Sequence, residues 1–229
     1  HRIHIEHLLR FEFRGQLVKK ILRIGIPNGL ENGMFQIGKL LVLGLVTPLG
    51  TSATAANAIA NSVAGVVNVP GNAISLSLIT VVGQCMGAGD SKQAVRYTRK
   101  LMTIVYLAMG SLSVLLFFFA TPVVGIFGLT PGAAVMAIQV LRWCAVFDLI
   151  FWPMSFSLPN ALRASGDAKF TMIVSMFSMW IFRIGFSYLL VPQIGLLGVW
   201  VAMFIDWIVR AVVFLNRFLS GRWKTKTVI

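Results

Sequence analysis

The sequence predicts an all-α integral membrane protein with six transmembrane helices, and three observations support this. The chain has 229 residues, of which 57% are hydrophobic and 12% charged, with a mean hydropathy of +0.84, whereas a soluble domain has about a quarter charged residues. Polar breaks separate six apolar stretches, each long enough to cross a bilayer core about 30 Å thick. In lipid only helices and closed barrels satisfy the backbone, and these stretches are too long for barrel strands.

The six spans are expected near residues 22–47, 54–84, 98–120, 134–162, 170–191 and 196–217. Prolines interrupt several of them, at Pro27, at Pro70-Gly71, and at Pro153 and Pro159, and each proline frees a backbone carbonyl. Residues 1–20 are expected to form a basic arm linking this lobe to another, 21–218 the six-helix lobe, and 219–229 a basic tail. The start at His1 rather than Met suggests a fragment of a longer protein, and no signal peptide is recognisable.

The net charge of +13 comes from twenty Lys and Arg against seven Asp and Glu, a balance that in a soluble protein would suggest a nucleic-acid surface. Sixteen of these cations fall in the arm, the second and fourth breaks and the tail, and none in the first, third and fifth breaks. Positive residues near span ends stay on the cytoplasmic side. We therefore expect cytoplasmic termini, residence in the plasma (inner) membrane, and no nucleic-acid partner.

Signals of soluble enzymes are weak in this chain. Cys85 and Cys144 lie singly in apolar runs, and the three histidines, His1, His4 and His7, crowd the arm. The turn 87–90 lacks the spacing of a dinucleotide-binding loop. No catalytic residue, metal site or cofactor is predicted, and the chain is not expected to be an enzyme.

Ionisable side chains inside spans are expensive and therefore mark functional candidates. In the first span, helical spacing places Asn28, Asn32, Phe35 and Lys39 in one stripe, with Glu31 beside it. This predicts a wet face that lines a cavity. The alternative is that Glu31 caps or pairs locally near the cytoplasmic end.

The second span carries four asparagines on one face, Asn57, Asn61, Asn68 and Asn72. Asparagines in a span either bond across a helix interface or line a hydrated cavity, and the sequence favours neither.

Asp148 in the fourth span is about 22 Å from the outer end and Glu31 about 25 Å, by the helical rise per residue. Two carboxylates at similar depth could bind Na⁺ or share protons, which outlines a coupling-ion site. The alternative is that Asp148 pairs with Arg142 or another cation as a structural element.

Arg183, Asp206 and Arg210 fall at similar depth on the last two spans and are expected to form a structural ion cluster. Lys39 is either a counter-ion to a carboxylate or a cation that competes with bound Na⁺ or H⁺, and we favour the second reading.

Three segments next to the spans carry a family resemblance. They are Ile26-Pro27-Asn28-Gly29-Leu30-Glu31, Val82-Gly83-Gln84-Cys85-Met86-Gly87-Ala88-Gly89-Asp90 and Leu162-Arg163-Ala164-Ser165-Gly166-Asp167. In this order and spacing the chain, over about residues 15–220, resembles the C-terminal six-helix half of the multidrug and toxic compound extrusion (MATE) transporters. The resemblance implies a protein of two six-helix lobes, so the partner of this chain is a missing N-terminal lobe.

The resemblance also implies an activity: Na⁺- or H⁺-coupled antiport that exports amphipathic or cationic drug-like molecules by rocking between inward-open and outward-open states. It places Glu31, Asn57, Asn61 and Asp148 around one cavity. Family members have their acidic residues about one helical turn away, near Phe35 and Trp152, which are expected to line the cavity. Either the acidic residues have moved one turn along the same helices, or this subgroup couples ions elsewhere, for example in the missing N-terminal half.

The sequence leaves three alternatives to a drug antiporter. A flippase for lipid-linked sugars or peptidoglycan precursor shares the lobe fold, but its cavity should be more cationic, and only Lys39 meets that expectation. A membrane enzyme acting on lipid head groups would need clustered acids or a His–acid pair, which the spans lack. A non-transporting scaffold would have no use for the polar stripes.

Overall fold

The computed structural model describes residues 15–225 of the chain. Within that range it does not describe the side chains of Leu17, Lys20, Ile21, Arg23, Ile24, Pro27, Asn28, Glu31 and Thr225. The predicted site residues Asn28 and Glu31 therefore have a described backbone, in the first helix, and side chains outside the described part. Most of the predicted basic arm and the last four residues of the tail also lie outside it.

The described residues form helices and turns. The α-helices are α1 (Gly15–Val46), α2 (Thr51–Val67), α3 (Val69–Gly87), α4 (Ser91–Gly125), α5 (Pro131–Ile150), α6 (Leu158–Ala164), α7 (Ala168–Ser178), α8 (Phe186–Ile194) and α9 (Leu196–Leu219). Two π-helical segments, Pro153–Ser157 and Met179–Gly185, and two 3₁₀ turns, Thr47–Leu49 and Arg222–Thr225, complete the described chain. Six candidate spans occur among these residues, which confirms the predicted all-α, six-span fold.

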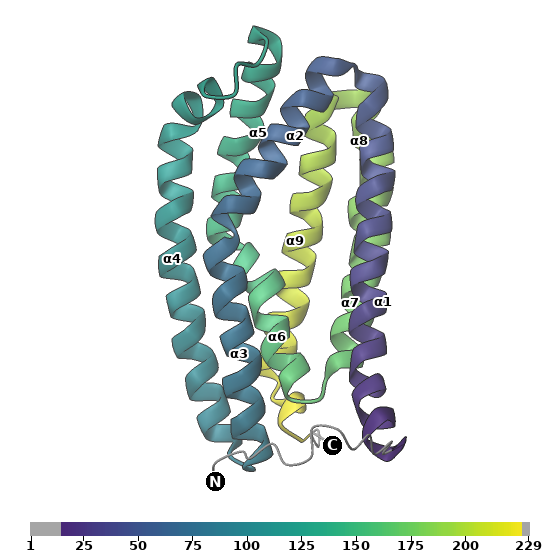
Figure 1. Cartoon of the computed structure of the whole chain (residues 1–229), viewed down its shortest axis with the longest axis vertical. Coiled ribbons are helices and arrows are strands. Elements are labelled where there is room, and N and C mark those ends of the chain that lie inside the picture. The colour runs from purple at the N-terminus through teal and green to yellow at the C-terminus, as the bar shows by residue number, and fades with distance from the viewer. Residues whose placement is uncertain (1–14, 226–229) are drawn as a thin grey trace, which may run out of the picture.

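The helices run side by side along the long axis of the molecule (Figure 1). Neighbours in sequence pack against each other, as α3 does with α4, α4 with α5, and α8 with α9, while α2 packs on α5 and α1 on α7. The turns between α3 and α4 and between α6 and α7 lie at the same end of the bundle as the end of α9 (Figure 1). The basic breaks of the sequence therefore gather at one end.

The second predicted span, 54–84, is two helices in the structure. α2 ends at Val67 and α3 begins at Val69, with Asn68 between them. Pro70 lies in the first turn of α3, where its missing N–H costs no helical hydrogen bond. Gly71 follows with no room for a side chain, because an added Cβ would collide with Met109 and Trp152. The break thus holds the chain close to α4 and to the end of α5.

The fourth and fifth spans each contain a π-helical segment. α5 continues through Pro153–Ser157 into α6, and α7 continues through Met179–Gly185 into α8. Both π-helical segments pack against α9. Such segments change which residues face a given side of a helix and are frequent at functional sites.

The turns that carry the family motifs have structural roles at one end of the bundle. Gly89 has a φ of 76°, which glycine adopts without strain, and Asp90 caps α4 by accepting a hydrogen bond from the Gln93 backbone N–H at 2.9 Å. Asp167 forms a 2.7 Å salt bridge with Arg217 of α9. These contacts fix the α3–α4 turn locally and tie the α6–α7 turn to the last helix.

Gly198 offers a test of how closely α8 and α9 cross. An added Cβ would meet the backbone of Leu190 and Val191, which cannot rotate away as a side chain can. We expect Gly198→Ala to destabilise the protein by about 1–3 kcal/mol, as overpacking does, and to lower the melting temperature in detergent. Gly44→Ala is the matched control, because a Cβ there meets nothing within 4 Å. Equal melting temperatures for the two variants would contradict the close crossing.

Candidate functional site

A polar cavity of about 570 Å³ lies inside the helix bundle. Its lining side chains come from α1, α2, α3, α5, α6 and α9 and from both π-helical segments. Segments far apart in the sequence therefore meet at one site, and all six spans except α4 contribute to it.

Carboxamide side chains form much of the cavity wall. The lining amides are Asn32, Gln36, Asn61, Asn68, Asn72 and Asn160. The Oδ1 atom of Asn68, at the break between α2 and α3, has no hydrogen-bond partner among the described residues. This oxygen is itself buried, so the unused acceptor lies within the wall rather than on its surface.

Asn57 differs from the expectation that it lines the cavity. It is buried, and its Oδ1 accepts hydrogen bonds from Trp200 Nε1 and from Asn61 Nδ2, each at 3.1 Å. One asparagine of the stripe thus joins α2 to α9, while Asn61, Asn68 and Asn72 line the cavity. The stripe therefore serves as both interface and wall.

The predicted wall residues of α1 and α5 mostly lie where expected. Asn32, Phe35 and Lys39 line the cavity, and Trp152 does so from the end of α5. The side chains of Asn28 and Glu31 lie outside the described residues, so their place at the cavity stays a prediction.

Asp148 is completely buried and is absent from the described cavity lining. The Cys144 thiol donates a hydrogen bond to its Oδ2 at 3.3 Å, whereas its Oδ1 has no partner among the described residues. Cys144 and Trp152, one turn before and one turn after it, both line the cavity. The carboxyl group therefore lies just behind the cavity wall.

Four cationic side chains line the cavity: Lys39, Arg163, Arg183 and Arg210. The sequence predicted only Lys39 there, and this prediction was too narrow. In the sequence, Arg163 belongs to the cations of the fourth break, which indicate only the orientation in the membrane. No acidic residue lines the cavity among those the structure describes.

Arg210 is buried and held by several contacts. Its Nη2 donates to the Ser155 carbonyl at 3.3 Å, and its guanidinium lies 4.5 Å from the ring centre of Phe156 and 5.0 Å from that of Phe35. Cation–π contacts of this kind gain strength away from water. Arg210 thus connects α9, the segment 153–157 and α1.

The expected ion cluster of Arg183, Asp206 and Arg210 has a different form from a closed triad. Asp206 is buried, its Oδ1 accepts a hydrogen bond from Ser178, and its Oδ2 has no hydrogen-bond partner in the described chain. An electrostatic interaction connects Asp206 to Arg183. Both arginines, unlike Asp206, line the cavity, and the π-helical segment that carries Arg183 turns it toward that side.

Aromatic rings complete the wall. Trp152 stacks on Phe156 with ring centres 5.2 Å apart, and Phe156 meets Trp207 edge to face at 5.8 Å. Trp200 and Met203 add further apolar surface from α9. The cavity therefore combines amides, cations and aromatic rings, a set that suits amphipathic small molecules.

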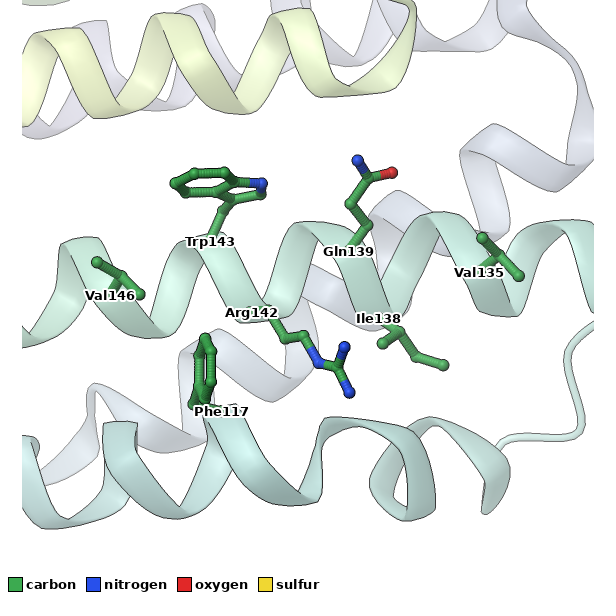
Figure 2. Close-up of a pocket in the computed structure, with 7 residues that line it drawn as sticks. All are labelled: Phe117, Val135, Ile138, Gln139, Arg142, Trp143 and Val146. Carbon is green, nitrogen blue, oxygen red and sulfur yellow. The ribbon is translucent and has the colours of Figure 1, made fainter.

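A second groove, of about 660 Å³, is lined by residues of α4 and α5 that do not line the polar cavity (Figure 2). It is lined by Phe117, Val135, Ile138, Gln139, Arg142, Trp143 and Val146. Figure 2 shows Arg142 on the side of α5 that carries Ile138 and faces the helix of Phe117. Arg142 is exposed there and Asp148 is buried, so the two do not form the structural pair that was the alternative for Asp148.

Comparison with known proteins identifies the family. A sequence model described as MatE matches residues 27–189. The chain belongs to the MATE family. Members of this family of multidrug efflux transporters are transporters rather than enzymes, and the resemblance found in the sequence is thereby confirmed.

Two relatives illustrate the similarity of this MATE chain. It is 29% identical over 213 residues to the "Probable multidrug resistance protein NorM" of Thermotoga maritima, covering 92% of this chain and 46% of that protein. It is 28% identical over 211 residues to human "Multidrug and toxin extrusion protein 1", covering 89% of this chain and 36% of that protein. The chain spans about half the length of the curated relatives it matches. Its membrane-spanning helices and its membership of the family make it an integral membrane protein.

Solved structures show the same fold. An outward-facing multidrug resistance MATE transporter of the MOP superfamily matches with a TM-score of 0.84 and 22% identity over 95% of this chain and 49% of that one. MATE in the bent conformation matches with a TM-score of 0.85 and 22% identity over 97% and 50%. The six helices described here thus have the fold of one half of a two-lobed MATE transporter.

Sequence reasoning missed several wall residues. Trp200, Met203, Trp207 and Arg210 recur at spacings of three and four on α9, which places them on one helix face, and this stripe could have been found. Asn160 and Arg163 follow Pro159 near the end of the fourth span, and no sequence signal separates them from the turn between α6 and α7.

The polarity of the cavity predicts access to water. A cysteine at position 61, in the cavity wall, should react with a membrane-impermeant methanethiosulfonate on the order of tenfold faster than one at position 107, because the reactive thiolate forms only in a hydrated setting. Leu107 is 69% exposed on the outside of α4 and serves as the lipid-facing control. The measurement is labelling of Asn61→Cys and Leu107→Cys above the level of the parent, whose two cysteines are buried. Equal labelling would contradict a hydrated cavity.

Proposed function

We propose that this chain is the C-terminal six-helix lobe of a cation-coupled MATE antiporter that exports amphipathic small molecules by alternating access. The cavity supports the proposal, because it joins hydrogen-bonding amides to aromatic rings within the membrane-spanning part of the lobe. The relatives that it matches are described as multidrug transporters, which does not favour a flippase. The missing partner is a second lobe of similar size.

The proposed orientation places both termini in the cytoplasm. It is supported by the gathering of the α3–α4 turn, the α6–α7 turn and the end of α9 at one end of the bundle (Figure 1). These are the segments rich in Lys and Arg, whereas the breaks at 47–51, 120–131 and 192–194 contain neither. The distribution follows the positive-inside rule.

Asp148 carries the proposed coupling to a cation. A buried carboxylate without a cationic partner is costly, so such a group is neutralised by a proton or a bound ion. In the described chain its Oδ1 has no partner and its Oδ2 has only the Cys144 thiol. We propose that H⁺ or Na⁺ reaches this group, with Glu31 of α1 as a second acidic residue at similar depth.

Exchange then depends on two states of the transporter. If the cation on Asp148 and the substrate in the cavity favour opposite states, the inward movement of one drives the outward movement of the other. The break at Asn68 and the two π-helical segments lie in the wall of the cavity, where a change of helix geometry would alter the site directly.

Asp148→Asn tests the coupling. It removes the ionisable group with little change of volume, so substrate binding should persist while transport driven by a Na⁺ or H⁺ gradient falls to the level of protein-free vesicles. The assay is efflux in proteoliposomes that contain this lobe with its second lobe, under each gradient separately. Asp90→Asn is the control, because it makes the same change at an exposed helix cap that asparagine also fills. Wild-type transport by Asp148→Asn under both gradients would refute the role of Asp148.

A further inference from the structure

The groove between α4 and α5 holds a charged side chain on the outside of the membrane-spanning bundle. Its volume is about 660 Å³, and Arg142 is exposed in it. We propose that this groove binds an anionic phospholipid of the surrounding membrane, with the lipid phosphate paired to Arg142. The groove and the polar cavity share no lining residue, so this lipid site is distinct from the proposed transport site.

Arg142 lies deep along its span. It comes eleven residues after Pro131, the first residue of α5, which places its Cα about 17 Å from that end of the helix. The hydrocarbon core of a bilayer is about 30 Å thick, so the side chain leaves the helix well inside the membrane. Figure 2 shows the guanidinium group directed along α5 toward Ile138, one turn nearer to the start of the helix. Long cationic side chains in spans reach in this way toward the nearer membrane surface.

No acidic residue with a described side chain balances Arg142. It makes no hydrogen bond or ion pair with another described residue, and Asp148, six residues further along α5, is fully buried. Glu31 is on α1, whose main neighbours are α7 and the segment 179–185. Gln139, the other polar residue of the groove, is uncharged, and Figure 2 shows it pointing away from the guanidinium group. Because an unpaired charge at membrane depth is costly, we expect its anion to come from outside the lobe.

The rest of the groove is apolar and fits an acyl chain. Val135, Ile138, Trp143 and Val146 lie on one face of α5, and Phe117 adds a ring from α4. From Val135 to Val146 this face is about 17 Å long, close to the thickness of one leaflet of the hydrocarbon core. A phosphate group joined to a chain of this length is what a phospholipid offers.

The position of α4 indicates that the groove meets lipid rather than the second lobe. α4 contributes no lining residue to the polar cavity. In transporters built from two repeats the substrate site lies at the interface between the repeats, so a helix outside the cavity is expected on the side away from the second lobe. Leu107 and Phe118 of α4 are 69% and 70% exposed in the described lobe, as apolar side chains that face lipid are.

The charge of Arg142 favours an anionic lipid over a zwitterionic one. A planar guanidinium group donates two parallel hydrogen bonds to a phosphate. Phosphatidylglycerol carries a net negative charge, whereas the choline group of phosphatidylcholine brings a second cation close to the arginine. α5 begins at the end of the bundle opposite the α3–α4 turn (Figure 1), so the lipid belongs to the leaflet at that end.

Trp143 can report occupancy of the groove, because it is 52% exposed there. The complete two-lobed protein is reconstituted in phosphatidylcholine vesicles, and the quenching of tryptophan fluorescence is compared for brominated phosphatidylglycerol and brominated phosphatidylcholine. Trp143→Phe, measured in parallel, identifies the part of the quenching that comes from Trp143. We expect the brominated phosphatidylglycerol to be preferred about fivefold at Trp143, as one cation near an anionic lipid provides.

Substitutions of Arg142 test whether this preference depends on its charge. Arg142→Gln should remove the preference, whereas Arg142→Lys should retain most of it, because the lysine keeps the positive charge. Arg96→Gln is the matched control: it makes the same change at an exposed position of α4, 21 residues before Phe117 and about 32 Å from it along the helix. Its preference at Trp143 should equal that of the parent. Arg142 is exposed, so its substitution leaves the packed core intact.

Four results would overturn the lipid site. The first is equal quenching of Trp143 by the two lipids, and the second is a parent-like preference in Arg142→Gln. The third is the absence of quenching of Trp143 by either lipid, which would mean that the second lobe or a second copy covers the groove. The fourth is relief of the quenching by inorganic phosphate, which would assign the site to a free anion. The assay requires no transport, so its result is independent of the proposed antiport.

Discussion

The cost of a charge or an unpaired polar group in a hydrocarbon layer governs this structure. The lobe has the composition of a membrane protein, yet seven charged residues lie in the interior of its spans, away from the span ends: Glu31, Lys39, Arg142, Asp148, Arg183, Asp206 and Arg210. Most of those with described side chains either line the polar cavity or lie buried beside it, as Asp148 and Asp206 do. Arg142 is the exception, because it lines the separate groove between α4 and α5 (Figure 2). A cavity of about 570 Å³ gives the cations that line it a polar setting that lipid would deny them.

Irregular helix geometry makes the cavity compatible with a membrane span. The break at Asn68, the segment 153–157 and the segment 179–185 all contribute lining residues. Hydrogen bonds from side chains stabilise the irregular backbone: Ser155 donates to the carbonyl of Phe151 and to that of Trp207, and Arg210 donates to the carbonyl of Ser155. Non-helical backbone at membrane depth is tolerated where protein or a cavity surrounds it.

The cavity separates two kinds of charge. The cations are on the wall and face the cavity, whereas the carboxyl groups of Asp148 and Asp206 are buried behind it. In the proposed antiporter, an ion at the buried carboxyl groups and a substrate in the cavity would occupy neighbouring places without sharing one group. Substitutions on the wall and substitutions behind it would then affect different steps.

Composition, span length and the motif turns determined the family, the six helices and the polar faces of α1 and α2, because these depend on local hydropathy and on spacing along one chain. Only the tertiary structure decided which polar residues meet. Asn57 turns to Trp200 instead of the cavity, and Arg163, Arg183 and Arg210 join Lys39 on one wall. The physical reason is that helical spacing fixes positions within a helix but not the rotation of that helix against its neighbours. A π-helical turn also shifts every later side chain to another face, so the positive character of the cavity emerged only when the helices were packed together.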